Sequence, residues 1–247
     1  GMVDSVVVVQ AGPVTRISIN RPECRNAVDG ATARALHHAF MAFERDDGAR
    51  VAVLSGEGGT FCAGADLRMV SAGDAHRMNP LEPFAAGEEH TIGPMGPSRL
   101  CLSKPVVAAV EGHAVAGGLE LALWCDVRVC GEGAVFGVFC RRWGVPLIDG
   151  GTVRLPRIVG AGRAMHMILT GCPVDAHTAL AWGLVTQVVP TGGAVAASLQ
   201  LAAQIAAFPQ NCVKADRLSA LRQWSLPELG ALEGEFQGGV AVLRDGA

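Results

Sequence analysis

Two glycine-rich segments hold the residues best suited to chemistry on a carbonyl group. The first, residues 58–67, reads GGTFCAGADL, and the second, residues 111–120, reads EGHAVAGGLE. Small residues allow a ligand to approach the main chain closely, and free N–H groups at a helix start attract negative charge. Two such N–H groups that converge on one carbonyl oxygen form an oxyanion hole, which stabilises the charge that develops there.

Strands and helices alternate along most of the chain and must position these segments. Short β-branched or apolar runs predict strands at residues 5–10, 14–20, 51–55, 105–110, 127–130, 134–138 and 185–189. Helical patterns predict helices at residues 31–46, 117–124, 154–159, 161–169 and 175–182, and a helical tail from residue 193 with breaks near Pro209 and Pro227. Residues 71–97 lack a clean period and predict a long loop or broken helix of the lid or binding type. This order predicts an α/β core with a helical C-terminal part.

The composition excludes several classes of protein. Hydrophobic residues make up 50% of the 247 residues and charged residues only 17%, which excludes intrinsic disorder and predicts a surface partly covered by sister subunits. A net charge of -3 without blocks of like charge gives no basis for nucleic-acid binding. Glu111, Glu120 and Asp126 interrupt the apolar stretch at residues 106–130, which argues against a membrane span.

The cysteines and the N-terminus favour a cytoplasmic protein. The eight Cys residues are scattered through apolar segments, with no CxxC pair and no Cys–His spacing typical of metal ligands. Reduced thiols that pack as small hydrophobic residues explain this pattern, and we expect no metal site. No basic leader segment is visible at the start of the sequence.

In this order along the chain, the two glycine-rich segments resemble the crotonase family, also called the enoyl-CoA hydratase/isomerase superfamily. The resemblance begins at INRPECRNA (residues 19–27) and continues through DGGTVRLPRIVG (residues 149–160) into the tail. It implies a spiral of ββα units over residues 1–190. For residues 191–247 it implies a helical part that shapes the acyl-CoA pocket and joins subunits into a homotrimer or a dimer of trimers. The implied substrate is an acyl-CoA thioester, with no cofactor beyond its CoA moiety.

The resemblance also implies where this substrate binds. The N–H groups of Ala65 and Gly117 match the family's oxyanion hole, which polarises the thioester carbonyl and stabilises an enolate. The turn that holds the adenine of CoA through backbone groups matches Ala63, Ala65, Asp66 and Leu67. Arg68 and Arg25 can reach the CoA phosphates, and a solvated surface charge is an equally good interpretation of each.

Hydratases of this family use two glutamates to handle the proton and the water. The first matches Glu120, where a carboxylate can hold water or exchange a proton at the α or β carbon of the thioester. The alternative use of Glu120 is to cap its own helix. The second position falls on Cys140, and a thiol with a pKa near 8.5 is a poor substitute for a carboxylate.

Asp149 is a candidate replacement, because naphthoate-synthase-like members of the family carry an aspartate at this place. Its alternative use is an N-cap for the helix near Gly151. Arg141 and Arg142 are expected to pair with Asp149 or Glu120 or to bind a substrate carboxylate. Cys140 is better explained as a small buried residue near the acyl pocket than as a nucleophile.

We therefore expect an acyl-CoA-processing enzyme that stabilises a thioester enolate and whose nearest activity is that of an enoyl-CoA hydratase, a lyase. The alternatives are ring closure, decarboxylation, thioester hydrolysis, isomerisation, or acyl-CoA binding without catalysis. A Rossmann-type nucleotide-binding protein is disfavoured because no GxGxxG occurs. A Clp-type serine protease is disfavoured because no serine occupies a nucleophile position next to the glycine-rich segments.

Overall fold

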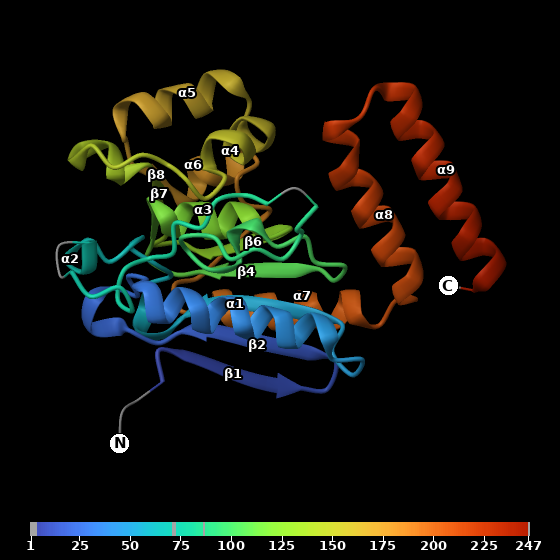
Figure 1. Cartoon of the computed structure of the whole chain (residues 1–247), viewed down its shortest axis with the longest axis horizontal. Coiled ribbons are helices and arrows are strands. Elements are labelled where there is room, and N and C mark those ends of the chain that lie inside the picture. The colour runs from blue at the N-terminus through green and yellow to red at the C-terminus, as the bar shows by residue number, and fades with distance from the viewer. Residues whose placement is uncertain (1–3, 71–72, 86, 247) are drawn as a thin grey trace.

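The computed structural model describes residues 4–70, 73–85 and 87–246, and its largest element is a six-stranded sheet (Figure 1). In spatial order the strands are β1 (Val6–Ala11), β2 (Val14–Ile19), β3 (Val51–Gly56), β4 (Val106–Val110), β6 (Val127–Gly131) and β9 (Gln187–Val189). β1 and β2 are antiparallel, and the other neighbouring pairs are parallel. The predicted strands at residues 5–10 and 14–20 are confirmed as β1 and β2, which form an antiparallel hairpin.

The main sheet is covered on both faces, which explains why its central strands are apolar throughout. α1 (Gly30–Arg45) covers one face and α7 (Ala194–Ala206) the other (Figure 1). Val51 and Val53 pack in a cluster with α7, whereas Ala52 and Leu54 pack in the larger cluster that includes α1. Successive residues of β3 therefore serve opposite faces, as the pleat of a strand requires.

A second sheet of three short strands brings the two glycine-rich segments together. Its order is β5 (His113–Val115), β7 (Val135–Gly137) and β8 (Val174–Asp175). Ala114 of β5 also forms an isolated parallel bridge with Cys62 of the first segment. The sequence predicts β7 but neither β5 nor β8, because β5 lies inside the second glycine-rich segment and β8 has only two residues.

The remaining helices of the core are α2 (Leu67–Val70), α3 (Gly117–Trp124), α4 (Gly151–Val159), α5 (Ala161–Thr170) and α6 (Ala176–Ala181). The predicted lid contains no regular helix or strand in the described stretches 73–85 and 87–96; residues 71, 72 and 86 lie outside the described residues. This loop is tied to the start of α1, because the N–H of Gly30 donates to the carbonyl of Arg77 at 2.8 Å.

α8 (Gln210–Arg222) and α9 (Glu228–Asp245) lie beside the core as a helical pair (Figure 1). The predicted breaks are confirmed, since Pro209 and Pro227 directly precede these helices. Neither helix has a buried residue, and Arg217 of α8 forms an ion pair with Asp126 of the core at 3.0 Å. The division at residue 190 and the assembly into trimers stay predictions. No helix in the described part of the chain combines the length and apolar character needed to cross a membrane.

Candidate active site

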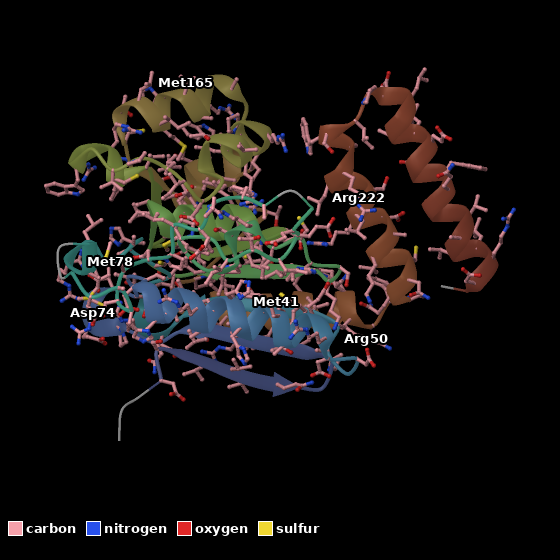
Figure 2. All side chains as sticks on the ribbon, in the orientation of Figure 1. Met41, Arg50, Asp74, Met78, Met165 and Arg222 are labelled. Atoms are coloured by element: carbon pink, nitrogen blue, oxygen red, sulfur yellow. The ribbon has the colours of Figure 1, made fainter. Side chains whose placement is uncertain are left out.

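A cavity of about 240 Å³ lies where the two glycine-rich segments meet. Its lining includes all five residues for which the sequence predicts a catalytic role: Ala65, Gly117, Glu120, Cys140 and Asp149. Ala63 and Leu67 of the predicted CoA turn also line it, as does Met78, which lies near the α2 end of the molecule (Figure 2). Residues far apart in the sequence are thus brought to one small space.

Glycines allow the two segments to touch through their main chains. A Cβ on Gly118 would lie 2.1 Å from the carbonyl oxygen of Cys62, and a Cβ on Gly117 would lie 2.8 Å from Sδ of Met95. Gly64 has a φ of +102°, and a Cβ there would lie 3.2 Å from the nitrogen of Gly117. No room for side chains remains between the two turns, so the backbone itself forms this wall of the cavity.

The N–H groups of Ala65 and Gly117 have no acceptor among the described residues. Ala65 forms a one-residue parallel bridge with Val28, in which the N–H of Asp66, not that of Ala65, donates to Val28 at 2.8 Å. Gly117 is the first residue of α3, where an N–H has no partner within the helix. Ala116 before it has a φ of +53°, a strained value for a residue other than glycine. Two free donors therefore border the same cavity.

Glu120 places a carboxyl group of raised pKa beside these donors. Its side chain is buried, and Oε2 accepts the N–H groups of Asp149 and Gly151, both at 2.8 Å. Burial, followed by the nearby charge of Asp149, raises the pKa of Glu120 to about 7. The alternative use of Glu120 as a cap of its own helix is wrong, because its hydrogen bonds go to Asp149 and to the first N–H of α4 and α3 has no side-chain cap. Oε1 has no partner in the described chain, so this oxygen is available to exchange a proton near neutral pH.

Asp149 supplies a second buried carboxyl group to the cavity. Oδ1 accepts the N–H of Met95 at 3.0 Å and the hydroxyl of Ser98, and burial raises the pKa of the Asp149 carboxyl. The predicted N-cap role is wrong, because Gly150 is the residue before α4 and the helix has no side-chain cap. The carboxyl instead ties the loop that carries Met95 to the cavity wall.

Cys140 lies in a short 3-10 helix, Phe139–Trp143, and is buried. Burial, followed by the charge of Glu120, raises the pKa of the thiol, so the thiolate needed for nucleophilic attack is disfavoured. The expected pairing of Arg141 and Arg142 with Glu120 or Asp149 is wrong. Arg141 donates to the carbonyl of Ile168 at 3.1 Å and Arg142 to that of Gly171 at 3.3 Å.

The predicted CoA turn lies at an exposed rim of the cavity. Asp66 accepts hydrogen bonds from Nε and Nη2 of Arg68, both at 3.0 Å, and from Arg21 at 3.2 Å. The bonds from Arg68 hold the pKa of the Asp66 carboxyl below its usual range. The Arg25 carbonyl accepts the N–H of Ala63 at 3.0 Å. The structure therefore brings both predicted phosphate-binding arginines next to the turn.

Three residues of the site are not predicted from the sequence: Met95, Ser98 and Trp143. Met95 and Ser98 lie in GPMGPS, residues 93–98, where two Gly-Pro pairs signal an ordered turn. Trp143 lines the cavity although its side chain is 74% exposed, which places a large apolar surface at the mouth. Its position in the sequence carries no signal that distinguishes it from a core residue.

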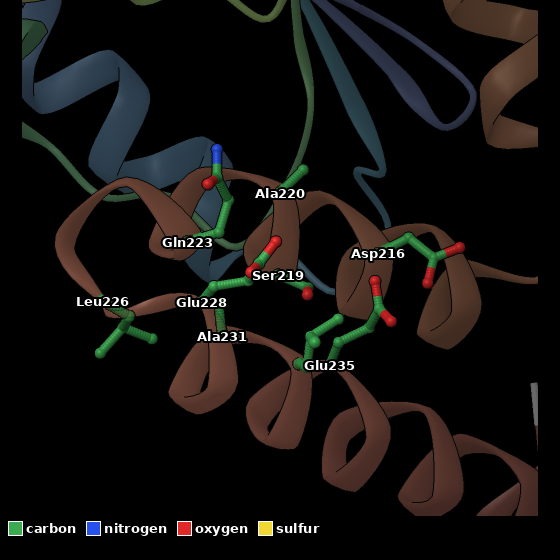
Figure 3. A pocket seen from close by; sticks show the side chains of 9 residues that line it. Asp216, Ser219, Ala220, Gln223, Leu226, Glu228, Ala231 and Glu235 are labelled. Carbon is green, nitrogen blue, oxygen red and sulfur yellow. The ribbon is translucent and has the colours of Figure 1, made fainter.

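A hollow of about 570 Å³ between α8 and α9 is larger than this cavity (Figure 3). Its polar lining includes Asp216, Glu228 and Glu235, and none of the predicted site residues lies there. Among the described residues no cluster of His, Cys, Asp or Glu has the arrangement needed to hold a metal ion. The chemistry of the described chain is thus concentrated at the glycine-rich segments.

Known proteins share both the sequence pattern and the fold. The family model described as enoyl-CoA hydratase/isomerase matches residues 10–237. Enoyl-CoA hydratase EchA19 of Mycobacterium tuberculosis is 35% identical over 96% of this chain and 87% of that protein. Carnitinyl-CoA dehydratase of Salmonella enteritidis is 36% identical over 83% of this chain and 75% of that protein.

A solved structure gives the same result in three dimensions. A crystal structure of enoyl-CoA hydratase from Mycobacterium tuberculosis has a TM-score of 0.87 and 32% identity, over 96% of this chain and 90% of that one. The crotonase-type α/β fold predicted from the sequence is therefore confirmed. With the match of the family model over most of the chain, this establishes that the chain belongs to the enoyl-CoA hydratase/isomerase family.

Proposed function

We propose that this protein is a hydratase-type lyase that adds or removes water across the 2,3 double bond of an acyl-CoA thioester. One observation carries the proposal: the acceptor-free N–H groups of Ala65 and Gly117 border the same cavity as the Glu120 carboxyl, whose pKa is about 7. Relatives named enoyl-CoA hydratase and carnitinyl-CoA dehydratase support it, because hydration and dehydration are one reaction in two directions.

In this mechanism the thioester oxygen accepts hydrogen bonds from both N–H groups. The oxygen of water bonds to C3, and the π electrons move toward the carbonyl to form an enolate. Its negative charge rests on the oxygen that Ala65 and Gly117 hold, and two preorganised donors stabilise that charge. The enolate then takes a proton at C2, which completes the hydrated product.

Glu120 and Asp149 handle the two protons. Asp149 accepts the proton that the water loses, and Glu120 donates the proton that C2 gains; the reverse reaction uses the same groups in opposite roles. Burial raises the pKa of both carboxyls, and the charge of Asp149 raises that of Glu120 further, so Glu120 keeps its proton up to about pH 7. Cys140 stays protonated and forms a small apolar part of the wall.

The CoA moiety occupies the exposed rim in this proposal. The main chain of the turn at Ala63, Asp66 and Leu67 binds the adenine, and the side chains of Arg25 and Arg68 meet the phosphates. No further cofactor is needed. We also propose that the protein works in the cytoplasm on fatty acyl substrates, as a trimer or hexamer assembled through its C-terminal helices.

A second candidate is an enolate reaction without water, such as isomerisation of a double bond. Cys140 stands where the family's hydratases carry their second glutamate, so Glu120 and Asp149 are the carboxyl groups of this cavity. Oδ1 of Asp149 is also already engaged by Met95 and Ser98, which leaves a single oxygen for chemistry. In that case Glu120 moves a proton between carbons of the substrate.

Mass spectrometry of crotonyl-CoA and longer enoyl-CoA esters in water labelled with heavy oxygen tests the proposal. We expect the product to gain one labelled oxygen, whereas an isomerase leaves the mass unchanged and shifts the double bond. Calorimetry with the saturated ester butyryl-CoA measures binding separately. Binding of the saturated ester without turnover of any enoyl ester would show a binding protein and contradict the proposal.

A further inference from the structure

A second cavity, of about 520 Å³, lies between α8 and the core and shares no lining residue with the active-site cavity. Five arginines line it: Arg128, Arg154, Arg157, Arg217 and Arg222. Its acidic residues are Glu89, which is exposed, and Asp126, which already pairs with Arg217. Since the whole chain has a net charge of -3, this cavity concentrates positive charge in a negatively charged protein.

Arg128 is the most deeply placed of these arginines, with its side chain 7% exposed. Nε donates to the carbonyl of Leu184 at 2.7 Å, and Nη1 donates to those of Ala122 and Cys125 at 3.1 and 2.7 Å. These bonds fix the guanidinium plane. Nη2 donates to no described residue and is not among the polar atoms sealed inside the protein, so its N–H groups remain available to the cavity.

Arg154 connects the cavity to the active-site loops. Nη1 donates to the carbonyl of Asp149 at 3.2 Å and Nη2 to that of Ser98 at 2.9 Å, while Nε has no acceptor in the described chain. Burial lowers the pKa of Arg154, as it does for Arg128, and the nearby charges of Glu120 and Asp149 offset this only in part for Arg154. Two desolvated cations with spare N–H groups thus border one space.

The outer arginines come from two elements that the cavity separates. Arg157 of α4 lies 5.0 Å from the ring centre of Trp224. Arg222 of α8 is exposed, and its guanidinium group makes no hydrogen bond or ion pair with the described residues. An oxyanion between these residues can accept bonds from the core and from α8 at once, since a guanidinium presents a planar fork of donors.

We propose that this cavity binds a small anion with two or more negative charges, of the phosphate or polycarboxylate class. The half-buried wall strengthens each charge-assisted hydrogen bond relative to water. The bound anion neutralises Arg157 and Arg222, whose guanidinium groups have no acceptor among the described residues, and it joins α8 to α4. The site is separate from the substrate cavity and independent of the reaction catalysed there.

Calorimetry on the full chain at constant ionic strength tests this site, with inorganic pyrophosphate and citrate as probes. Saturating CoA is present, so that Arg25 and Arg68 at the substrate rim are occupied. We expect saturable binding with a single site per chain, and the tighter probe identifies phosphate or carboxylate as the preferred group. Arg222→Gln and Arg157→Gln each weaken binding about ten-fold, the loss of one charge-assisted contact.

Arg163→Gln is the matched control. Arg163 lies on α5, outside this cavity, and like Arg157 it faces a tryptophan, at 5.3 Å from the ring centre of Trp182. This variant leaves binding unchanged. Arg128→Gln is expected to abolish binding; should this variant fail to fold, the two exposed arginines still decide. The proposal is overturned if neither probe binds saturably in the presence of CoA, or if Arg222→Gln and Arg157→Gln bind like the wild type.

Discussion

The two walls of the active-site cavity are built in different ways. One wall is main chain, and Gly117 and Gly118 leave no room there even for a Cβ. The other wall consists of side chains from three separate elements, Glu120, Cys140 and Asp149. In the proposed mechanism the first wall selects a carbonyl compound that passes through an enolate, and the second decides which proton moves. A shared fold therefore specifies the class of intermediate more firmly than the reaction.

The walls are nevertheless joined at one point. The N–H of Met95 donates to Asp149 at 3.0 Å, and the side chain of Met95 packs against Gly117. The carboxyl on one wall therefore helps to position the main chain on the other. Substitutions that separate chemistry from packing are needed to tell the two contributions apart.

The largest expected effect comes from Glu120→Gln on the side-chain wall. The amide oxygen can still accept the N–H groups of Asp149 and Gly151, but it cannot exchange a proton near neutral pH. We expect kcat for crotonyl-CoA to fall about 10²- to 10⁴-fold. Loss of the enoyl absorbance measures the rate, and unchanged affinity for butyryl-CoA shows that the cavity is intact. A rate within a few-fold of the wild type would remove Glu120 from the mechanism.

Ala65→Pro tests the main-chain wall. Proline has no N–H, so the variant loses one oxyanion donor, and turnover should fall about 10²- to 10³-fold. Ala65→Ser keeps the N–H and serves as the matched control, with a loss of only a few-fold. The same steady-state assay reports both. Similar losses in the two variants would argue that the side chain at this position, rather than its backbone, matters.

Asp149→Asn asks whether the replacement carboxyl works as the second proton carrier. Oδ1 of asparagine still accepts from Met95 and Ser98, so packing is preserved. We expect turnover to fall about 10²-fold, the lower end for general acid–base help, without a change in butyryl-CoA affinity. The crotonyl-CoA assay measures it, and a variant with full turnover would show that Asp149 carries no proton in the reaction.

The raised pKa of Glu120 also predicts how stability depends on pH. The folded protein holds this proton up to about pH 7, whereas the unfolded chain releases it near 4.5. The folded state therefore binds more protons between these values, and the free energy of unfolding falls by about 3 kcal/mol as pH rises from 4.5 to about 7.

Urea unfolding across this pH range measures the effect, with Glu120→Gln for comparison. The variant should lack this decrease, although the smaller decrease from Asp149 remains. Equal slopes for wild type and variant would show that Glu120 titrates normally in the folded protein.

Cys140→Ser has the smallest expected effect. The thiol keeps its proton and takes no part in the proposed mechanism, so we expect turnover within about three-fold of the wild type, as for a nearly isosteric change. The steady-state assay with crotonyl-CoA measures it. A loss comparable to that of Asp149→Asn would assign the thiol a direct role.

The comparison of the two walls also explains which features the sequence predicts. The main-chain wall depends on local patterns, a strand followed by a glycine-rich turn, so the two glycine-rich segments are identifiable from the sequence. The resemblance to the crotonase family then implies Ala65 and Gly117 within them. The α/β core and the helical tail follow from hydrophobic periods and the prolines at 209 and 227. β5 is missed because it lies inside the second glycine-rich segment, and β8 is missed because it has only two residues.

The side-chain wall depends on contacts between distant segments, which local patterns cannot reveal. Glu120 and Asp149 each suggest a helix cap when only neighbouring residues are considered, and both interpretations are wrong. Glu120 instead accepts the N–H of Gly151, and Asp149 accepts that of Met95. Raised pKa values arise from the same burial, so they too appear only in the folded chain.

The pH dependence of kcat/KM for the hydration of crotonyl-CoA tests the central claim most directly, because it reports the pKa values of the free enzyme. The proposed mechanism needs Glu120 protonated, so kcat/KM should fall as pH rises through about 7. It also needs Asp149 ionised, so kcat/KM should fall again at low pH, where Asp149 gains its proton. Ala65→Ser should lower kcat/KM at every pH without moving the pH at which kcat/KM falls near 7. A wild-type profile that stays flat, or that rises, between about pH 6 and about pH 8 would contradict the assignment of Glu120 as the proton donor.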